Sequence, residues 1–144
     1  MRIVIVGSNP THEIWKKVEF MVNIFLDDLR KCPEDYLVFR TAESLILFLQ
    51  HNPETEINIL SLDHDLGLEA LDGYDFVKEI YLQFPDIKIK EVRLHTDNFT
   101  GFRNMYYYFI NAIKNEALPN IEYVSPYLYD VIDGEIKKGL RFTN

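Results

Sequence analysis

The sequence predicts an α/β protein with a doubly wound, five-stranded parallel sheet, helices on both faces, an N-terminal extension and a C-terminal β-hairpin. The main observation is that short apolar runs, which suit buried strands, alternate along the chain with segments of helical periodicity. Units of this kind build parallel sheets through right-handed crossovers. The hairpin is predicted by Asp133-Gly134, which separates two runs of alternating hydrophobicity.

The chain is expected to form one domain, since 144 residues fall within the usual size of a single folded unit. We predict an N-terminal extension over residues 1–20 that holds an extra strand or short helix. The α/β domain follows over residues 21–126, and the hairpin over 127–144 belongs to the same domain. The predicted strands are short, apolar and bounded by polar residues. They span residues 22–26, 36–39, 57–60, 87–94 and 121–124.

Three predicted helices connect these strands. Thr41 is suited to cap the helix over residues 42–50, and Asn52-Pro53 ends it. Residues 74–84 and 102–114 carry apolar side chains at helical spacing, which predicts that each helix packs one side against the sheet.

Composition and charge argue against several classes of function. The net charge of −8 disfavours extended nucleic-acid binding, so the expected partner is a small phosphorylated ligand or one RNA end. Gly-rich phosphate-binding loops are absent, which argues against P-loop nucleotidases and dinucleotide oxidoreductases. No apolar run is long enough for a membrane span, and the single cysteine, Cys32, fits a reducing compartment. We therefore predict a cytoplasmic protein, and no sequence feature specifies its oligomeric state.

Polar side chains follow three of the predicted strands. Asp27 and Asp28 follow the first strand, Asp63-His64-Asp65 the third, and residues 95–98 the fourth. Because open α/β sheets bind ligands at the carboxyl ends of their strands, we expect these groups to converge in one pocket. Several carboxylates in one pocket require either a cation or a retained proton.

The acidic strand ends predict a divalent-metal site. Oxygen ligands favour Mg²⁺, and His64 or His95 in the ligand set would bring in Mn²⁺ or another transition metal. The alternative interpretation is local: Asp27 or Asp28 caps a turn, and Asp65 closes a loop ahead of Gly67.

Four stretches of the chain resemble the cyclic-phosphate processing receiver-like family (cREC), a divergent relative of response-regulator receiver domains. They are Leu26-Asp27-Asp28-Leu29-Arg30, Ser61-Leu62-Asp63-His64-Asp65-Leu66-Gly67, Gly73-Tyr74-Asp75 and residues 95–105. The Leu-Asp-His-Asp-Leu-Gly run is the most specific of them, and the resemblance covers about residues 21–124. It implies a receiver-type, flavodoxin-like fold whose pocket processes cyclic or terminal phosphates, in RNA repair or in conflict between viruses and hosts.

The resemblance also implies functional positions, which are Asp27, Asp28, Asp63, His64, Asp65, His95, Thr96 and Asn98. Our leading hypothesis is a metal-assisted phosphoesterase that acts on a cyclic phosphate, in which Asp27, Asp28 and Asp63 are the predicted ligands of Mg²⁺ or Mn²⁺. In it His64, His95 and Asp65 act as catalytic groups that activate water or protonate the leaving oxygen. The predicted substrate-binding side chains are Thr96, Asn98, Arg30 and Arg103.

Two alternative functions stay open. The same pocket suits a sensor or sequestering module that binds a phosphorylated nucleotide without cleaving it, and Asp63 suits a phosphoacceptor in signalling. Two departures count against ordinary signalling: Ser125-Pro126 stands where signalling receivers have Lys-Pro, and the hairpin replaces their last helix. Thr96 stands where the cREC pattern more often has Ser, which keeps the hydroxyl group.

Overall fold

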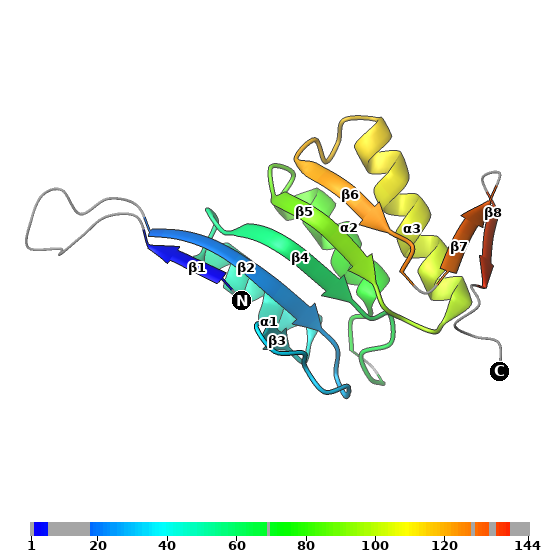
Figure 1. Ribbon diagram of the computed structural model, residues 1–144, viewed down its shortest axis with the longest axis horizontal. Helices are drawn as coiled ribbons and strands as arrows, with labels where there is room; N and C mark the ends of the chain where they lie inside the picture. Colours follow the sequence, from blue (N-terminus) through cyan, green and yellow to red (C-terminus); the bar gives the residue numbers. More distant parts are fainter. Residues whose placement is uncertain (1, 6–17, 69, 128, 133–134, 139–144) are drawn as a thin grey trace, which may run out of the picture.

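The computed structural model describes residues 2–5, 18–68, 70–127, 129–132 and 135–138 (Figure 1). Their elements follow in the order β1 (Arg2–Ile5), β2 (Val18–Leu26), β3 (Leu37–Phe39), α1 (Ala42–His51), β4 (Glu56–Leu62), α2 (Gly73–Gln83), β5 (Lys88–Leu94), α3 (Phe99–Lys114), β6 (Ile121–Ser125), β7 (Tyr129–Ile132) and β8 (Glu135–Lys138).

Five parallel strands form the body of the sheet, in the spatial order β3-β2-β4-β5-β6. β1 lies antiparallel to the first half of β2, whereas β3 pairs with its last three residues. β7 and β8 form a separate antiparallel pair. The predicted α/β class, the five parallel strands and the C-terminal hairpin are therefore confirmed, while the predicted turn at 133–134 lies outside the described residues.

All three helices lie on one side of the sheet, behind it in Figure 1, with α2 packed between α1 and α3. The expected helices on both faces are not observed among the described residues. The segment from β2 to β3 contains Pro33 and forms no helix there, and β6 leads into the hairpin instead of a helix. We call the side of the sheet without helices the open face.

The two faces of the sheet differ in the side chains that they carry. On β5, Val92 and Leu94 point toward the helices and are fully buried, whereas Glu91 and Arg93 point to the open face and are half-buried. This alternation is typical of a sheet with one dry and one solvated face. The hydrophobic core therefore lies between the sheet and the helices. None of the helices among the described residues has the length and hydrophobicity needed to cross a membrane.

Side-chain caps fix the first turns of the two helices that border the carboxyl end of the sheet. Asp72 caps α2 and forms a reciprocal capping box with Asp75, at 2.8 and 3.1 Å. Asn98 caps α3 by accepting a hydrogen bond from the Gly101 amide at 2.9 Å. α3 consequently begins at Phe99, three residues before the predicted start, because the cap lies inside the polar cluster that follows β5.

Candidate functional site

A cavity of about 600 Å³ lies where β2, β4 and β5 end, and the arrowheads of these strands in Figure 1 point to that edge of the sheet. We call it the acidic cavity. Its charged lining, among the described residues, consists of Asp27, Asp28, Asp63, Asp65, Asp72, Asp97 and Arg30. The structure thus brings together acids from separate strand ends. Asp97 belongs to the polar run 95–98 that was expected to reach this pocket. Asp72 was not among the predicted site residues, although the spacing of Asp72 and Asp75 is a recognisable capping signal.

Three buried groups at the floor of this region come closest together. Asp27, Asp63 and His95 each follow directly after a strand, and their potential ligand atoms all lie within 4.8 Å of one another. Backbone hydrogen bonds continue the sheet past the strands: the Asp63 amide donates to Leu26 at 3.0 Å, and the His95 amide to Leu62 at 2.9 Å. The register of the sheet therefore determines this cluster.

Asp27 is held by three hydrogen bonds. Its Oδ1 accepts from the backbone amides of Leu29 at 2.9 Å and Arg30 at 2.8 Å, and its Oδ2 accepts from Nε2 of His95 at 2.9 Å. Burial alone would raise the pKa of Asp27, but the two amides and His95 outweigh it, so the pKa lies below its usual value. Asp27 is therefore ionised at neutral pH.

His95 connects Asp27 to Ser61. Burial lowers its pKa more than the Asp27 carboxylate raises it, so the ring is neutral near pH 7. A carboxylate only accepts hydrogen bonds, so the proton of the neutral ring is on Nε2, and Nδ1 accepts from the Ser61 hydroxyl at 2.7 Å. Phe25 stacks on the ring with centroids 4.6 Å apart. Neither Ser61 nor Phe25 was among the predicted site residues.

Among the described carboxyl groups, Asp63 is the one whose surroundings most disfavour ionisation. Burial raises its pKa, and the negative charge of Asp27 raises it further. Hydrogen bonds from the His64 amide, at 2.8 Å, and from the Thr96 hydroxyl only partly offset this, as does the charge of Arg30. Thr96 is fully buried, so the structure places this predicted substrate-binding residue behind Asp63, where it orients the carboxyl group.

His64 lies beside the acidic cavity and is not among the residues that line it. Its Nδ1 lies 2.8 Å from Asp65 Oδ1, and its Nε2 lies 3.5 Å from Asp72 Oδ2. The amide group of Asn98 contacts both the ring and the Asp65 carboxylate, at 3.2 to 3.3 Å. A Cβ atom on Gly101 would lie 2.3 Å from the ring. His64 and Asn98 therefore hold Asp65, which is exposed, at the edge of the cavity.

The two predicted arginines occupy different places. Arg30 lines the acidic cavity, donates to the backbone oxygen of His95 at 2.7 Å and lies 3.7 Å from Asp27 and 3.8 Å from Asp97. Arg103 is exposed, lies over the Phe99 ring and does not line the cavity. Only Arg30 is positioned to meet a ligand there.

The residues present fit a divalent cation. Two carboxylates and the His95 ring converge within 4.8 Å. Burial and the negative charge of Asp27 raise the pKa of Asp63, and a bound cation would offset both effects. Asp28, the third predicted ligand, lines the same cavity, but among the described residues the closest set contains His95 in its place. The carboxylate oxygens suit Mg²⁺ or Mn²⁺, whereas both ring nitrogens of His95 are engaged by Asp27 and Ser61.

Together, the fold and site define an α/β domain of the receiver type, with acidic and imidazole groups at the carboxyl ends of its parallel strands. The family model of the cyclic-phosphate processing receiver domain (cREC) matches residues 22–111, which is more than half of the chain. The chain belongs to this family, as its motifs predicted. A comparison with curated proteins found no match.

Proposed function

We propose that the acidic cavity binds a divalent cation and hydrolyses a cyclic phosphate ester. The observation that carries this proposal is the buried cluster of Asp27, Asp63 and His95, whose ligand atoms lie within 4.8 Å beneath an open cavity. Membership of a family described by cyclic-phosphate processing supports the substrate class. Arg30, at the edge of the cavity, is the cationic side chain suited to a phosphoryl oxygen.

The proposed reaction opens the phosphate ring. A water oxygen bonds to phosphorus, one bond from phosphorus to a ribose oxygen breaks, and that oxygen takes up a proton, which leaves a phosphomonoester and a free hydroxyl group. When bound, a divalent cation polarises the phosphoryl oxygens and lowers the pKa of water. Asp27 and Asp63 hold the cation, and His95 keeps the Asp27 carboxylate oriented through its 2.9 Å hydrogen bond.

Proton transfer is assigned to the pair of Asp65 and His64. Asp65 lines the cavity and is solvent-exposed, so it reaches a bound water, whereas His95 is buried with both ring nitrogens engaged. The His64 ring, 2.8 Å from Asp65, is placed to share the proton that the carboxylate accepts. The same pair returns the proton to the leaving ribose oxygen.

The test uses the full chain and an oligonucleotide that ends in a 2′,3′-cyclic phosphate, with Mn²⁺ or Mg²⁺. Mass spectrometry should detect the gain of one water, and Asp63→Asn should lower the rate by about 100-fold or more, as loss of a metal-positioning group does. Asp86→Asn is the matched control, since Asp86 is exposed on the turn before β5. No turnover with either metal, or an unchanged rate in Asp63→Asn, would overturn the proposal.

The same samples separate the two other candidate functions. Recovery of the intact cyclic phosphate in a tight complex that depends on Asp63 would indicate a binding module. Incubation with acetyl phosphate, followed by intact mass, tests phosphoacceptor signalling. A phosphoryl gain that disappears in Asp63→Asn would support signalling in place of hydrolysis.

A further inference from the structure

A second pocket lies on the open face of the sheet, next to the acidic cavity. Its floor contains a row of neighbouring side chains from three strands: Phe25 on β2 is paired in register with Ser61 on β4, and Ser61 with Arg93 on β5. The pocket has a volume of about 260 Å³. We call it the open-face pocket.

The walls of this pocket come from segments that replace helices. Pro33 and Tyr36 belong to the irregular segment between β2 and β3, and Tyr127 follows β6 just before the hairpin. Tyr36 meets the edge of the Phe25 ring at a centroid distance of 6.2 Å. The pocket exists because, in the described part of the chain, no helix covers this end of the open face.

The charge of the open-face pocket is opposite to that of the protein. Arg30, Lys31 and Arg93 line it, and no carboxylate does so among the described residues, although the chain has a net charge of −8. Lys31 is exposed and forms no ion pair within the part of the chain that the structure describes. Glu91 accepts from Nε of Arg93 at 2.8 Å, which leaves the two Nη groups of that guanidinium for a ligand.

The two pockets share one lining residue and adjoin at His95. Arg30 lines both of them. His95 faces Asp27 in the acidic cluster through Nε2 and the pocket residue Ser61 through Nδ1. A ligand that occupies both pockets would therefore run past Arg30, with one part beside the aspartates and another beside Lys31 and Arg93.

We propose that the open-face pocket binds a second phosphate group of the nucleotide whose cyclic phosphate occupies the acidic cavity. Three cations and aromatic walls are the groups that recognise phosphate and the attached nucleoside. A volume of 260 Å³ falls below the roughly 300 to 1,000 Å³ of pockets that enclose whole ligands, so this pocket suits one part of a larger molecule. The assignment of one molecule to both pockets rests on the proposed function.

The substrate class is consequently narrower than cyclic phosphates in general. A cyclic phosphate at the end of an oligonucleotide, or on a nucleoside that also carries a 5′-phosphate, has the second anionic group. A nucleoside 2′,3′-cyclic phosphate without a 5′-phosphate lacks it, and we expect it to be a poorer substrate.

A binding experiment tests the pocket without catalysis. The metal-free, ¹⁵N-labelled full chain is titrated with 5′-AMP at low salt, with adenosine as the comparison. Amide shifts should cluster at Phe25, Ser61 and Arg93, adenosine should bind at least about tenfold more weakly, and Lys31→Glu should weaken 5′-AMP binding by about tenfold. Lys88→Glu, on an exposed residue at the other end of the sheet, is the control and should bind 5′-AMP normally.

Several results of this titration would overturn the proposal that the open-face pocket binds phosphate. They are equal binding of adenosine and 5′-AMP, shifts that cluster elsewhere, and normal binding by Lys31→Glu. Since Lys31 is exposed, its replacement is not expected to disturb folding. Arg93→Gln provides a second variant, which removes the guanidinium charge beside Glu91 and should also weaken 5′-AMP binding.

A cleavage experiment tests whether both pockets hold one molecule. Adenosine 2′,3′-cyclic phosphate is compared with the same compound carrying a 5′-phosphate, and kcat/KM should be about tenfold higher for the second. Lys31→Glu should remove this preference while changing the rate on the first compound less than twofold. An equal rate on both compounds would overturn the inference and leave the proposed hydrolysis standing. Cleavage of neither compound, with 5′-AMP binding that depends on Lys31, would overturn the hydrolysis and support the pocket.

Discussion

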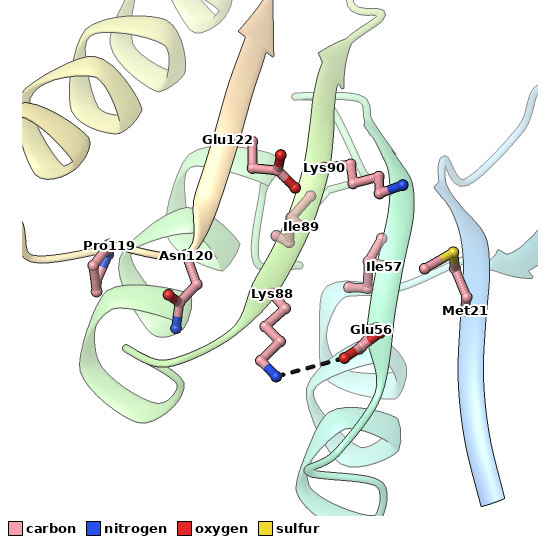
Figure 2. A pocket seen from close by; sticks show the side chains of 9 residues that line it. All are labelled: Met21, Glu56, Ile57, Lys88, Ile89, Lys90, Pro119, Asn120 and Glu122. Atoms are coloured by element: carbon pink, nitrogen blue, oxygen red, sulfur yellow. Dashed lines mark hydrogen bonds and ion pairs between the residues drawn. The ribbon is translucent and has the colours of Figure 1, made fainter. Parts of the chain in front are cut away.

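The two ends of the parallel sheet each carry a concave surface, but the charges on them are arranged differently. The groove at the amino ends of the strands has a volume of about 360 Å³ and contains Lys88 and Lys90 together with Glu56 and Glu122 (Figure 2). Lys88 pairs with Glu56 at 3.5 Å, and its side chain is exposed. The acidic cavity at the opposite end has six aspartates against one arginine among the described residues. The candidate site is distinguished from this groove by its excess of negative charge, part of it buried, more than by its volume.

The chain connectivity explains this difference. β4 and β5 lead at their carboxyl ends into loops that are followed by α2 and α3, so these two helices begin beside the acidic cavity. Helix amino termini carry partial positive charge and free amides, which favour anionic side chains such as Asp72 at the cap of α2. At the other end, helices finish and the strands begin. Exposed lysines and glutamates there neutralise one another at the surface.

Among variants that compare the two ends of the sheet, Asp63→Asn is expected to have the largest effect on activity and stability. Besides the loss of activity described above, this variant should unfold at a higher temperature than the wild type in the absence of metal. The reason is that an amide removes a buried charge that Asp27 repels. Addition of Mn²⁺ should raise the melting temperature of the wild type but not that of the variant. A similar Mn²⁺ shift in both proteins would locate metal binding outside the cavity.

Gly73→Ala tests how tightly the carboxyl end of the sheet is packed. A Cβ atom at position 73 would lie 2.1 Å from the backbone oxygen of Asp63 and 2.9 Å from the sulfur of Met105. Backbone cannot yield easily, so we expect about 3 kcal/mol of destabilisation in urea unfolding. In Gly101→Ala the clash is with the His64 side chain, and the expected loss is smaller, about 1 to 2 kcal/mol. A loss below about 0.5 kcal/mol for Gly73→Ala would contradict this packing.

The pH dependence of stability provides a test of His95. Its pKa is lowered in the folded protein, so between that value and its usual value of about 6.5 the unfolded chain binds more protons. The stability contribution of His95 is therefore present above this window and is lost as the pH falls through it. His95→Gln should flatten that part of the pH profile, measured by urea unfolding without metal.

His51→Gln is the matched control for the pH experiment. His51 is exposed at the end of α1. Its replacement should leave the pH dependence of the unfolding free energy the same as in the wild type. If His95→Gln retains the wild-type slope and His51→Gln loses it, the buried imidazole is not the group that titrates.

The smallest effects are expected at the amino end of the sheet. Lys88→Ala breaks an exposed ion pair, which is worth at most about 1 kcal/mol at low salt and less at high salt. The rate on a cyclic phosphate should be unchanged within twofold. A large loss of activity in Lys88→Ala would remove the contrast between the two ends of the sheet.

Much of the fold was predictable because it depends on local patterns. The apolar runs predict the strands, and carboxyl ends of parallel strands must meet at one edge, so Asp27, Asp63 and His95 were correctly expected to lie near one another. The covering of the sheet was not predictable in the same way. Periodicity shows that a helix has an apolar side, but it does not show which face of the sheet that side meets.

The directions of individual side chains were less predictable than their neighbourhood. Thr96 and His64 both belong to the stretches that resemble the family. Thr96 is fully buried behind Asp63, whereas His64 packs against Gly101. Sequence spacing places a residue at a strand end and leaves its side-chain direction undetermined. The sequence did not predict the open-face pocket for a related reason. Phe25, Ser61 and Arg93 become neighbours only through the register of the sheet.

The hairpin has a consequence for how much of the chain the site requires. Tyr129 of β7 is buried, with its ring centroid 4.2 Å from that of Phe102 and 5.5 Å from that of Phe99 in the first turn of α3. β6, which pairs with β5, also lies beyond residue 111, where the family match ends. A fragment trimmed to residues 22–111 would lose both supports of the segment that carries His95 and Asn98. The segment of chain that supports the pocket is therefore longer than the segment matched by the family model.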